Sequence, residues 1–313
     1  MSYIEKKILG RKVHTYFVKK VSFMGKLQVI KKYIGASPLK INKEKYILDH
    51  IEELSNEELK FKSKFLEEVE DIISHSKNLP KKIELKSIKL NNSIEGKKCE
   101  EVINTEFAKE FIFNSNNIEG SKIPPERVRE IIDTGDTKYN NRNEVKEVKN
   151  SILAFNYLQK SFKFNLNSIK RLYHILTKDL FMEGNLPYPR GFKTENVIVG
   201  NSRTTPPERV KEELTNLTNW YRNNKNKLHP IILAFEFHKR YEFIHPFRDG
   251  NGRTGRLIMN KILISAGYPP IIVYKGNKTT YFNLLEKSKS YYHFMLEQTD
   301  KSYDYLLKVI DKY

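Results

Sequence analysis

The chain contains one cysteine, Cys99, among its 313 residues. A single cysteine excludes a disulfide framework and any zinc site built from several cysteines. Long apolar runs are also missing, since none approaches the roughly 20 residues that cross a bilayer, and the first residues lack the apolar core of a signal peptide. With only 14 glycines and 12 prolines, the chain is not of low complexity. We therefore expect a globular, cytoplasmic protein that does not contact membranes.

Acidic residues are scarce beside basic ones. The sequence has 56 Lys and Arg against 38 Asp and Glu, a formal net charge of +18. Such a surface attracts polyanions but does not say which. The imbalance is strongest in residues 1–40, which contain ten Lys or Arg, one acid and five aromatic residues.

Residues 1–40 are predicted to form a small β-rich module. Extended segments are expected over 11–20 and 26–34, with a turn around Gly25. A basic sheet that carries aromatic rings can bind single-stranded nucleic acid by stacking. The alternative is that the rings pack on the following helices while the lysines are only solvated.

From Asn42 onward, apolar residues recur with the helical period of 3.6. Helices are expected over 43–54 and 56–77. The segment 80–96 is polar and mixed, and it reads as a linker or docking segment. We therefore treat 41–96 as a helical and linker region.

The range 97–313 reads as one helical domain. Helices are expected over 97–114, 124–133, 143–161, 166–181, 206–225, 229–243, 252–266, 277–287 and 301–312. Prolines mark two helix starts, one at Pro124 and one after Thr205, which we expect to be an N-cap. The helical run breaks at 190–204, where a short strand and turn predict a hairpin. The predicted fold class is mainly α with one β-hairpin.

The most informative stretch is 245–256, which reads HPFRDGNGRTGR. It lies between two predicted helices that are apolar almost all round, 229–243 and 252–266. A polar, glycine-rich loop between two core helices is held at both ends, as a pre-organised site requires.

Glycines and arginines in this stretch indicate a phosphate site. Gly250 and Gly252 allow backbone N–H groups to point toward one ligand where the next helix begins, which makes an anion site. Arg253 and Arg256 are three residues apart, so both reach the same side of the first helical turn. Taken singly, these features are a turn and a solvated pair of arginines; together within twelve residues they favour a nucleotide-phosphate site.

Two further side chains suggest chemistry at that site. Asp249 is a lone carboxylate beside the phosphate site and is best explained as a ligand for Mg²⁺. His245 can accept a proton from an attacking hydroxyl, although a lone histidine is more often structural. The stretch is not a Walker A loop, and the chain contains no H-E-x-x-H zinc motif.

The stretch 245–256 resembles the signature of Fic-domain proteins, H-x-F-x-[D/E]-G-N-G-R-x-x-R, and matches it at every specified position. The likeness runs from about residue 97 to the end of the chain. It implies a Fic-type helical core whose hairpin at 190–204 is a flap that pairs with the target segment. It also implies the transfer of AMP from ATP, with Mg²⁺, to a Ser, Thr or Tyr hydroxyl of a target protein.

The resemblance also implies residue roles. His245 would be the catalytic base and Asp249 the metal ligand. The nucleotide would be bound by Val199, Gly200, Asn201, Ser202, Asp249, Gly250, Asn251, Gly252, Arg253, Thr254, Gly255, Arg256 and Tyr281. Tyr281 would lie against the adenine, or else be a core tyrosine. Lys289 stands where the family often has an asparagine that contacts the nucleotide.

A second motif precedes the core. Residues 115–120 resemble the inhibitory motif [S/T]-x-x-x-E-[G/N] of a subset of the family. Glu119 would occupy Arg256, which otherwise binds the γ-phosphate, and Ser115 would anchor the turn by a hydrogen bond to Asn251. The alternative is an ordinary helix C-cap with Gly120 in the left-handed conformation.

The resemblance thus implies a self-inhibited protein adenylyltransferase that also modifies itself. The same site would serve the removal of AMP from a modified target, with Glu119 positioning a water. A contrasting hypothesis is a nucleic-acid-binding protein that reads its ligand through residues 1–40 and uses the core as a nucleotide sensor. A homodimer is also compatible with the sequence.

Overall fold

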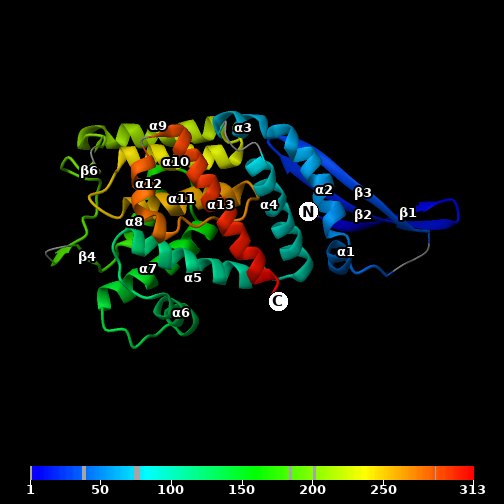
Figure 1. The fold of residues 1–313 in the computed structure, drawn as a ribbon, viewed down its shortest axis with the longest axis horizontal. Coiled ribbons are helices and arrows are strands. Elements are labelled where there is room, and N and C mark those ends of the chain that lie inside the picture. Colours follow the sequence, from blue (N-terminus) through cyan, green and yellow to red (C-terminus); the bar gives the residue numbers. More distant parts are fainter. Residues whose placement is uncertain (1, 37–39, 74–77, 183–184, 200–201, 286) are drawn as a thin grey trace. The chain divides into compact units, whose positions relative to one another are not determined.

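The computed structural model describes residues 2–36, 40–73, 78–182, 185–199, 202–285 and 287–313. The chain divides into two compact units. The first comprises Met1–Asn104 together with Thr299–Tyr313, and the second comprises Thr105–Gln298. The ribbon confirms a mainly helical chain with a small sheet at the N-terminus (Figure 1).

The N-terminal sheet is an antiparallel meander of β1 (Ser2–Leu9), β2 (Lys12–Phe23) and β3 (Lys26–Gly35). The two predicted extended segments and the turn at Gly25 are confirmed, and β1 is an additional strand. One face of the sheet packs on the helices that follow, and the Phe17 ring stacks on one of them.

The helices of the first unit begin directly after the sheet. They are α1 (Lys43–Asp49), α2 (Ile51–Lys62), the 3-10 turn η1 (Ser63–Phe65), α3 (Glu67–Ile73) and α4 (Asn78–Lys97). The expectation of a linker over 80–96 is wrong, because α4 is a continuous helix there.

Buried polar side chains explain why α4 shows no clear apolar period. Glu84 is fully buried and lies 3.1 Å from the Lys62 ammonium. Asn92 accepts a hydrogen bond from Lys19 and donates one to Ser55 at 2.9 Å. The inward face of α4 is therefore partly polar and is satisfied by partners that lie far away in the sequence.

The second unit contains the remaining helices. They are α5 (Glu100–Ile118) and α13 (Ser288–Ile310), which both cross the boundary between the units, α6 (Pro125–Thr134), α7 (Arg142–Lys160), α8 (Leu166–Leu176), α9 (Val210–Asn224), α10 (Pro230–Ile244), α11 (Asn251–Ser265) and α12 (Lys278–Leu284). Short 3-10 turns, η3 (Pro207–Arg209) and η4 (Lys275–Asn277), precede α9 and α12.

Two hairpins of two-residue strands interrupt these helices. β6 (Ile198–Val199) pairs with β7 (Ser202–Arg203) inside the predicted hairpin range. β4 (Phe181–Met182) pairs with β5 (Leu186–Pro187), a hairpin that the sequence did not predict because such strands are too short to show alternation.

The predicted N-cap at Thr205 is wrong. Pro206 occupies the cap position before η3, with no side-chain cap bond, and the Thr205 backbone N–H donates to the Phe243 carbonyl instead.

Helices α10 and α11 pack against each other in the core of the second unit. Phe235 and Tyr241 of α10 and Ile258 of α11 are fully buried. The loop that joins these helices, residues 245–250, is therefore anchored on both sides. Within the described part of the chain, no helix is both long and apolar enough to cross a membrane.

Candidate functional site

The loop between α10 and α11 has a defined backbone conformation. His245 ends α10 in the left-handed region, with a φ of 47°, and Gly250 caps α11 with a φ of 78°. The Asn251 side chain accepts from the Phe247 N–H at 2.9 Å and donates to the Phe247 carbonyl at 2.8 Å. The Phe247 ring stacks on Tyr173, with the ring centroids 3.7 Å apart. These contacts hold the loop in one shape.

His245 is largely enclosed and neutral. Burial lowers its pKa to about 4, with a further contribution from the nearby Lys193 charge. Its Nδ1 atom is buried and has no hydrogen-bond partner among the residues that the structure describes. A neutral imidazole is the form that can accept a proton.

Lys193 is a functional neighbour that the sequence did not indicate. Its buried ammonium donates to Thr204 Oγ1 at 2.6 Å and to the Ile244 carbonyl at 3.3 Å. Burial lowers its pKa to about 8. Lys193 and Thr204 flank the segment that carries the β6–β7 hairpin. The Lys193 side chain thus links this segment to the end of α10, beside His245.

Arg253 and Asp249 are joined through one tyrosine. The Tyr188 hydroxyl donates to Asp249 Oδ2 at 2.6 Å and accepts from Arg253 Nη2 at 3.1 Å. Arg253 also donates to Glu147 Oε1 at 2.9 Å, and the Gly250 N–H donates to Asp249 Oδ1 at 2.5 Å. The carboxylate proposed for metal binding and the arginine proposed for phosphate binding therefore share a partner.

Arg256 is fully buried and faces the end of α5. It donates from Nε to Ser115 Oγ at 3.0 Å, and from Nη2 to the Ser115 carbonyl at 2.9 Å and to Glu119 Oε1 at 2.6 Å. A side chain at Gly252 would collide with the Glu119 carboxylate. The predicted bond between Ser115 and Asn251 is wrong, because Ser115 binds Arg256 while Asn251 binds the loop backbone.

The turn after α5 is a helix cap as well. Gly120 has a φ of 109°, a conformation that favours glycine. The N–H groups of Glu119 and Ser121 both donate to the Asn116 carbonyl, at 3.1 Å each. The cap fixes the direction in which Glu119 leaves the helix, so the capping alternative and the Arg256 contact are realised together.

Thr254 and Gly255 lie inside α11. Thr254 Oγ1 donates to the Gly250 carbonyl at 2.8 Å. A side chain at Gly255 would collide with Glu242 and crowd His238, both on α10. Thr254 therefore stabilises the start of α11, and Gly255 allows the close contact between α10 and α11.

Tyr281 on α12 is fully buried, and its hydroxyl lies 2.6 Å from His238 Nε2. In this structure it has the position of a core tyrosine. Of the predicted flap residues, Val199 ends β6 and Ser202 begins β7. Gly200 and Asn201 lie outside the described residues.

Beneath the loop, two titratable groups are completely buried. Burial lowers the pKa of His238 to about 3 and raises the pKa of Glu242 to about 8. Their side chains lie 3.7 Å apart. At neutral pH the favoured state of both groups is uncharged, which avoids the cost of burying separate charges.

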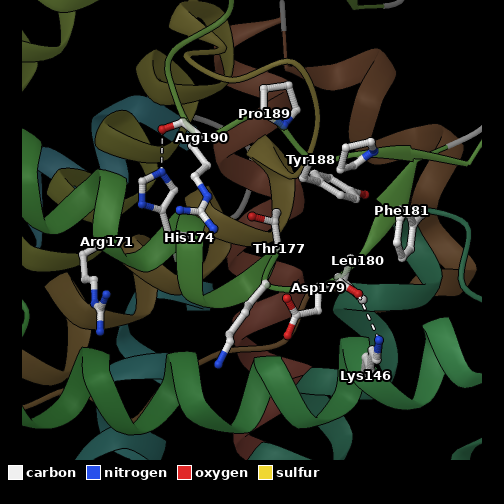
Figure 2. Close-up of a pocket in the computed structure, with 12 residues that line it drawn as sticks. Lys146, Arg171, His174, Thr177, Asp179, Leu180, Phe181, Tyr188, Pro189 and Arg190 are labelled. Carbon is white, nitrogen blue, oxygen red and sulfur yellow. Dashed lines mark hydrogen bonds between the residues drawn. The ribbon is translucent and has the colours of Figure 1, made fainter.

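A cavity of about 540 Å³ lies beside Tyr188 (Figure 2). Its lining includes the basic side chains Lys146, Arg171, Lys178 and Arg190. Lys146 Nζ donates to the Asp179 carbonyl at 3.3 Å, and His174 Nε2 is 2.7 Å from the Arg190 carbonyl. Because Tyr188 also binds Asp249 and Arg253, this cavity reaches the edge of the loop.

The residues of the loop fit a magnesium ion that is bound together with a substrate. No group of three or more His, Cys, Asp or Glu side chains gathers anywhere in the described ranges. Asp249 is a single carboxylate at the start of α11. Mg²⁺ typically binds through one or two carboxylates plus substrate phosphates, so a lone carboxylate beside a phosphate site is suitable.

Comparison with known proteins agrees with this geometry. Residues 163–263 match the Fic/DOC family. The chain is similar to "Protein adenylyltransferase Fic" of Drosophila mojavensis, at 31% identity over 188 residues, which are 56% of this chain and 36% of the relative. The corresponding protein of Nematostella vectensis is 28% identical over 57% of this chain and 43% of its own length.

The chain thus spans less than half the length of these curated relatives. The crystal structure of a Fic family protein from Desulfovibrio desulfuricans G20 has the same fold, with a TM-score of 0.63 and 23% identity over 74% of this chain and 73% of that one. The resemblance read from residues 245–256 is confirmed. Within this chain, residues 163–263 are therefore the part that resembles the Fic/DOC family.

Proposed function

We propose that this chain is a protein adenylyltransferase that transfers AMP from Mg-ATP to a hydroxyl group of a target protein. One observation carries the proposal: the loop of residues 245–250 and the first two turns of α11 bring a neutral histidine, a glycine-capped helix N-terminus and two buried arginines together. Such a helix end binds phosphates through its N–H groups. The relatives named as protein adenylyltransferases support the same activity.

In the proposed reaction, His245 accepts the proton of the target hydroxyl. The hydroxyl oxygen forms a bond to the α-phosphorus of ATP, the bond between that phosphorus and the bridging oxygen breaks, and pyrophosphate leaves. Arg253 and the N-terminus of α11 hold the phosphates in place. Asp249 would hold Mg²⁺, which neutralises phosphate charge when bound.

We further propose that Glu119 inhibits this reaction. Its carboxylate accepts a hydrogen bond from the Arg256 guanidinium, which donates two more bonds to Ser115. An arginine that is already paired offers less to a γ-phosphate, so ATP would bind in a non-productive pose or weakly. Activation then requires Glu119 to leave Arg256.

Removal of AMP from a modified target is a second function that the site can serve. Glu119 lies in contact with the arginine of the phosphate site, where a carboxylate can position a water for attack on a bound phosphodiester. The two functions differ in their response to one substitution, because Glu119→Gly would raise transfer and abolish removal.

The test is intact-mass spectrometry after incubation with Mg-ATP. The proteins are the wild type, Glu119→Gly, and Glu119→Gly combined with His245→Ala. We expect adducts of one or more AMP groups on Glu119→Gly alone, because only that variant combines a free Arg256 with an intact base. Binding of a fluorescent ATP analogue to Glu119→Gly, with and without His245→Ala, shows that the sites of these two variants are folded.

Adducts on the double variant would remove His245 as the base. Equal modification of the wild type and Glu119→Gly would remove the inhibitory role of Glu119. If Glu119→Gly binds nucleotide but modifies neither itself nor any protein of a cell extract, the proposed transfer is wrong.

A further inference from the structure

The sheet of the first unit has two different faces. The strand pairing assigns each residue of the meander to one of two faces. One face carries the odd-numbered residues of β1, the even-numbered residues of β2 and the odd-numbered residues of β3 as far as Tyr33. We call this the outer face. The opposite face packs on α1, where Phe17 stacks on Tyr46, and on η1, where Phe23 meets Phe65 edge-on.

The aromatic residues of this module divide between the two faces by type. The phenylalanines are on the packed face, whereas Tyr3, Tyr16 and Tyr33 are on the outer face. The Tyr16 and Tyr33 rings are 5.4 Å apart, and the His14 ring is 5.7 Å from Tyr33. Tyr33 is 55% exposed. The outer rings therefore do not pack on the helices that follow, and they form a surface cluster.

Basic side chains surround this cluster. The outer face carries Lys7, Lys12, Lys20 and Lys31 against a single acid, Glu5. Lys31 Nζ lies 4.3 Å from the centre of the Tyr16 ring, and Lys20 Nζ lies 5.8 Å from that of Tyr3. Both ammonium groups lie over ring faces, and Lys31 is also paired with the Glu5 carboxylate.

The outer face also exposes apolar surface that its own unit leaves uncovered. Leu27 is 63% and Val29 44% exposed, and both lie on the same face, further along β3 from the rings and opposite Ser22 and Lys20. Flat rings and apolar side chains bordered by cations offer stacking and phosphate neutralisation at once. That combination suits unpaired bases on a charged backbone.

We propose that the outer face binds single-stranded nucleic acid by stacking a base on the exposed Tyr33 ring while the lysines neutralise phosphates. Duplexes fit poorly, because their bases are already stacked and present only edges to a protein. An acidic protein would use the lysines but would not need the rings. The inference concerns the first unit and does not depend on the proposed AMP transfer.

The experiment measures fluorescence anisotropy of a labelled 20-nucleotide oligo-dT with the full chain at 50 mM salt. Tyr33→Ala should weaken binding about 5- to 150-fold, the range for one lost base stack, while Tyr33→Phe keeps the ring and should bind almost as the wild type does. Lys20→Gln should lower the slope of log affinity against log salt by about 0.7. Lys211→Gln, an exposed lysine on α9, is the matched control and should leave the slope unchanged.

Three outcomes would overturn the proposal. They are absence of binding at 50 mM salt, equal affinity of Tyr33→Ala and Tyr33→Phe, and duplex DNA competing as well as the single strand. Circular dichroism of each variant separates loss of binding from loss of fold, and Tyr33 is exposed enough that its substitution should leave the fold intact. Catalytic variants such as His245→Ala should bind the oligonucleotide as the wild type does.

Discussion

At the residue scale, the Tyr188 hydroxyl forms hydrogen bonds to two charged groups of the site. It donates to Asp249, accepts from Arg253 and lines the basic cavity. The two charged groups that it joins are those proposed to hold Mg²⁺ and phosphate. A group that orients both without touching the reacting hydroxyl acts as a positioning residue.

Tyr188→Phe should therefore slow AMP transfer in the Glu119→Gly background by about 10- to 100-fold, because each hydrogen bond to a charged group contributes about 1.5–3 kcal/mol. The Mg²⁺ concentration that gives half-maximal rate should rise, since the Asp249 carboxylate loses its donor. Initial rates from intact-mass time courses at several Mg²⁺ concentrations measure both effects. Tyr157→Phe on α7 is the control, and an unchanged Mg²⁺ dependence in Tyr188→Phe would contradict the positioning role.

The contiguous part of the site was predictable from the sequence, and the distant part was not. Residues 245–256 lie within one loop and one helix turn, so their chemistry can be read together. Glu147 and Tyr188 lie 106 and 65 residues from Arg253, in segments without a recognisable motif. Only the tertiary fold brings them to the loop. The same holds for Lys193, a lysine that sequence alone would place in solvent.

At the element scale, α4 shows the limits of hydrophobic periodicity. Its inward face includes Glu84, which shares the Lys62 ammonium with Glu58 at 3.1 and 3.3 Å. Both carboxylates and the lysine are buried. Such a network can be recognised only when its partners, here on α2, are known. By contrast, helices with apolar faces such as α10 and α11 were placed within a residue or two of their ends.

Removal of the shared cation should destabilise this network strongly. Lys62→Met leaves the buried Glu84 carboxylate without its counter-charge, whereas Glu58 keeps its ion pair with Lys19, and the free energy of unfolding should fall by about 3–5 kcal/mol. Lys82→Met removes an ion pair to Asp300 in which the lysine is 55% exposed, and it should cost less than about 1 kcal/mol. Urea unfolding followed by circular dichroism compares the two. Equal losses would show that the buried network contributes no more than a surface pair.

At the scale of the whole molecule, three buried groups beneath and beside the loop give stability a defined pH dependence. The pKa values of His238 and His245 are lowered to about 3 and about 4, and that of Glu242 is raised to about 8. Below pH 6.5 both histidines are protonated in the unfolded chain only, whereas Glu242 is protonated in the folded chain only. The unfolded chain therefore binds one proton more, and the free energy of unfolding falls as the pH falls. Between pH 6.5 and 8 only the folded chain holds the Glu242 proton, and it loses that proton as the pH rises.

The combined contribution of these three groups to the free energy of unfolding is therefore greatest near pH 6.5. In Glu242→Gln the fall in the free energy of unfolding between pH 6.5 and 8 should be smaller by about 1–2 kcal/mol, because an amide does not ionise. Urea unfolding at both pH values measures the change. Glu208→Gln, at an exposed position, is the control. An unaltered decline in Glu242→Gln would mean that Glu242 is already ionised in the folded protein.

The net charge of +18 does not appear as unpaired positive charge at the phosphate site. Arg253 and Arg256 project from the first two turns of α11, and each is paired with a carboxylate, that of Glu147 and that of Glu119 respectively. The basic chain as a whole attracts every abundant polyanion in its surroundings. With both guanidinium groups already matched, a stray phosphate or a strand of nucleic acid gains little by settling at the loop. The paired arginines thus disfavour non-specific anion binding at the phosphate site, while the rest of the basic surface still attracts anions.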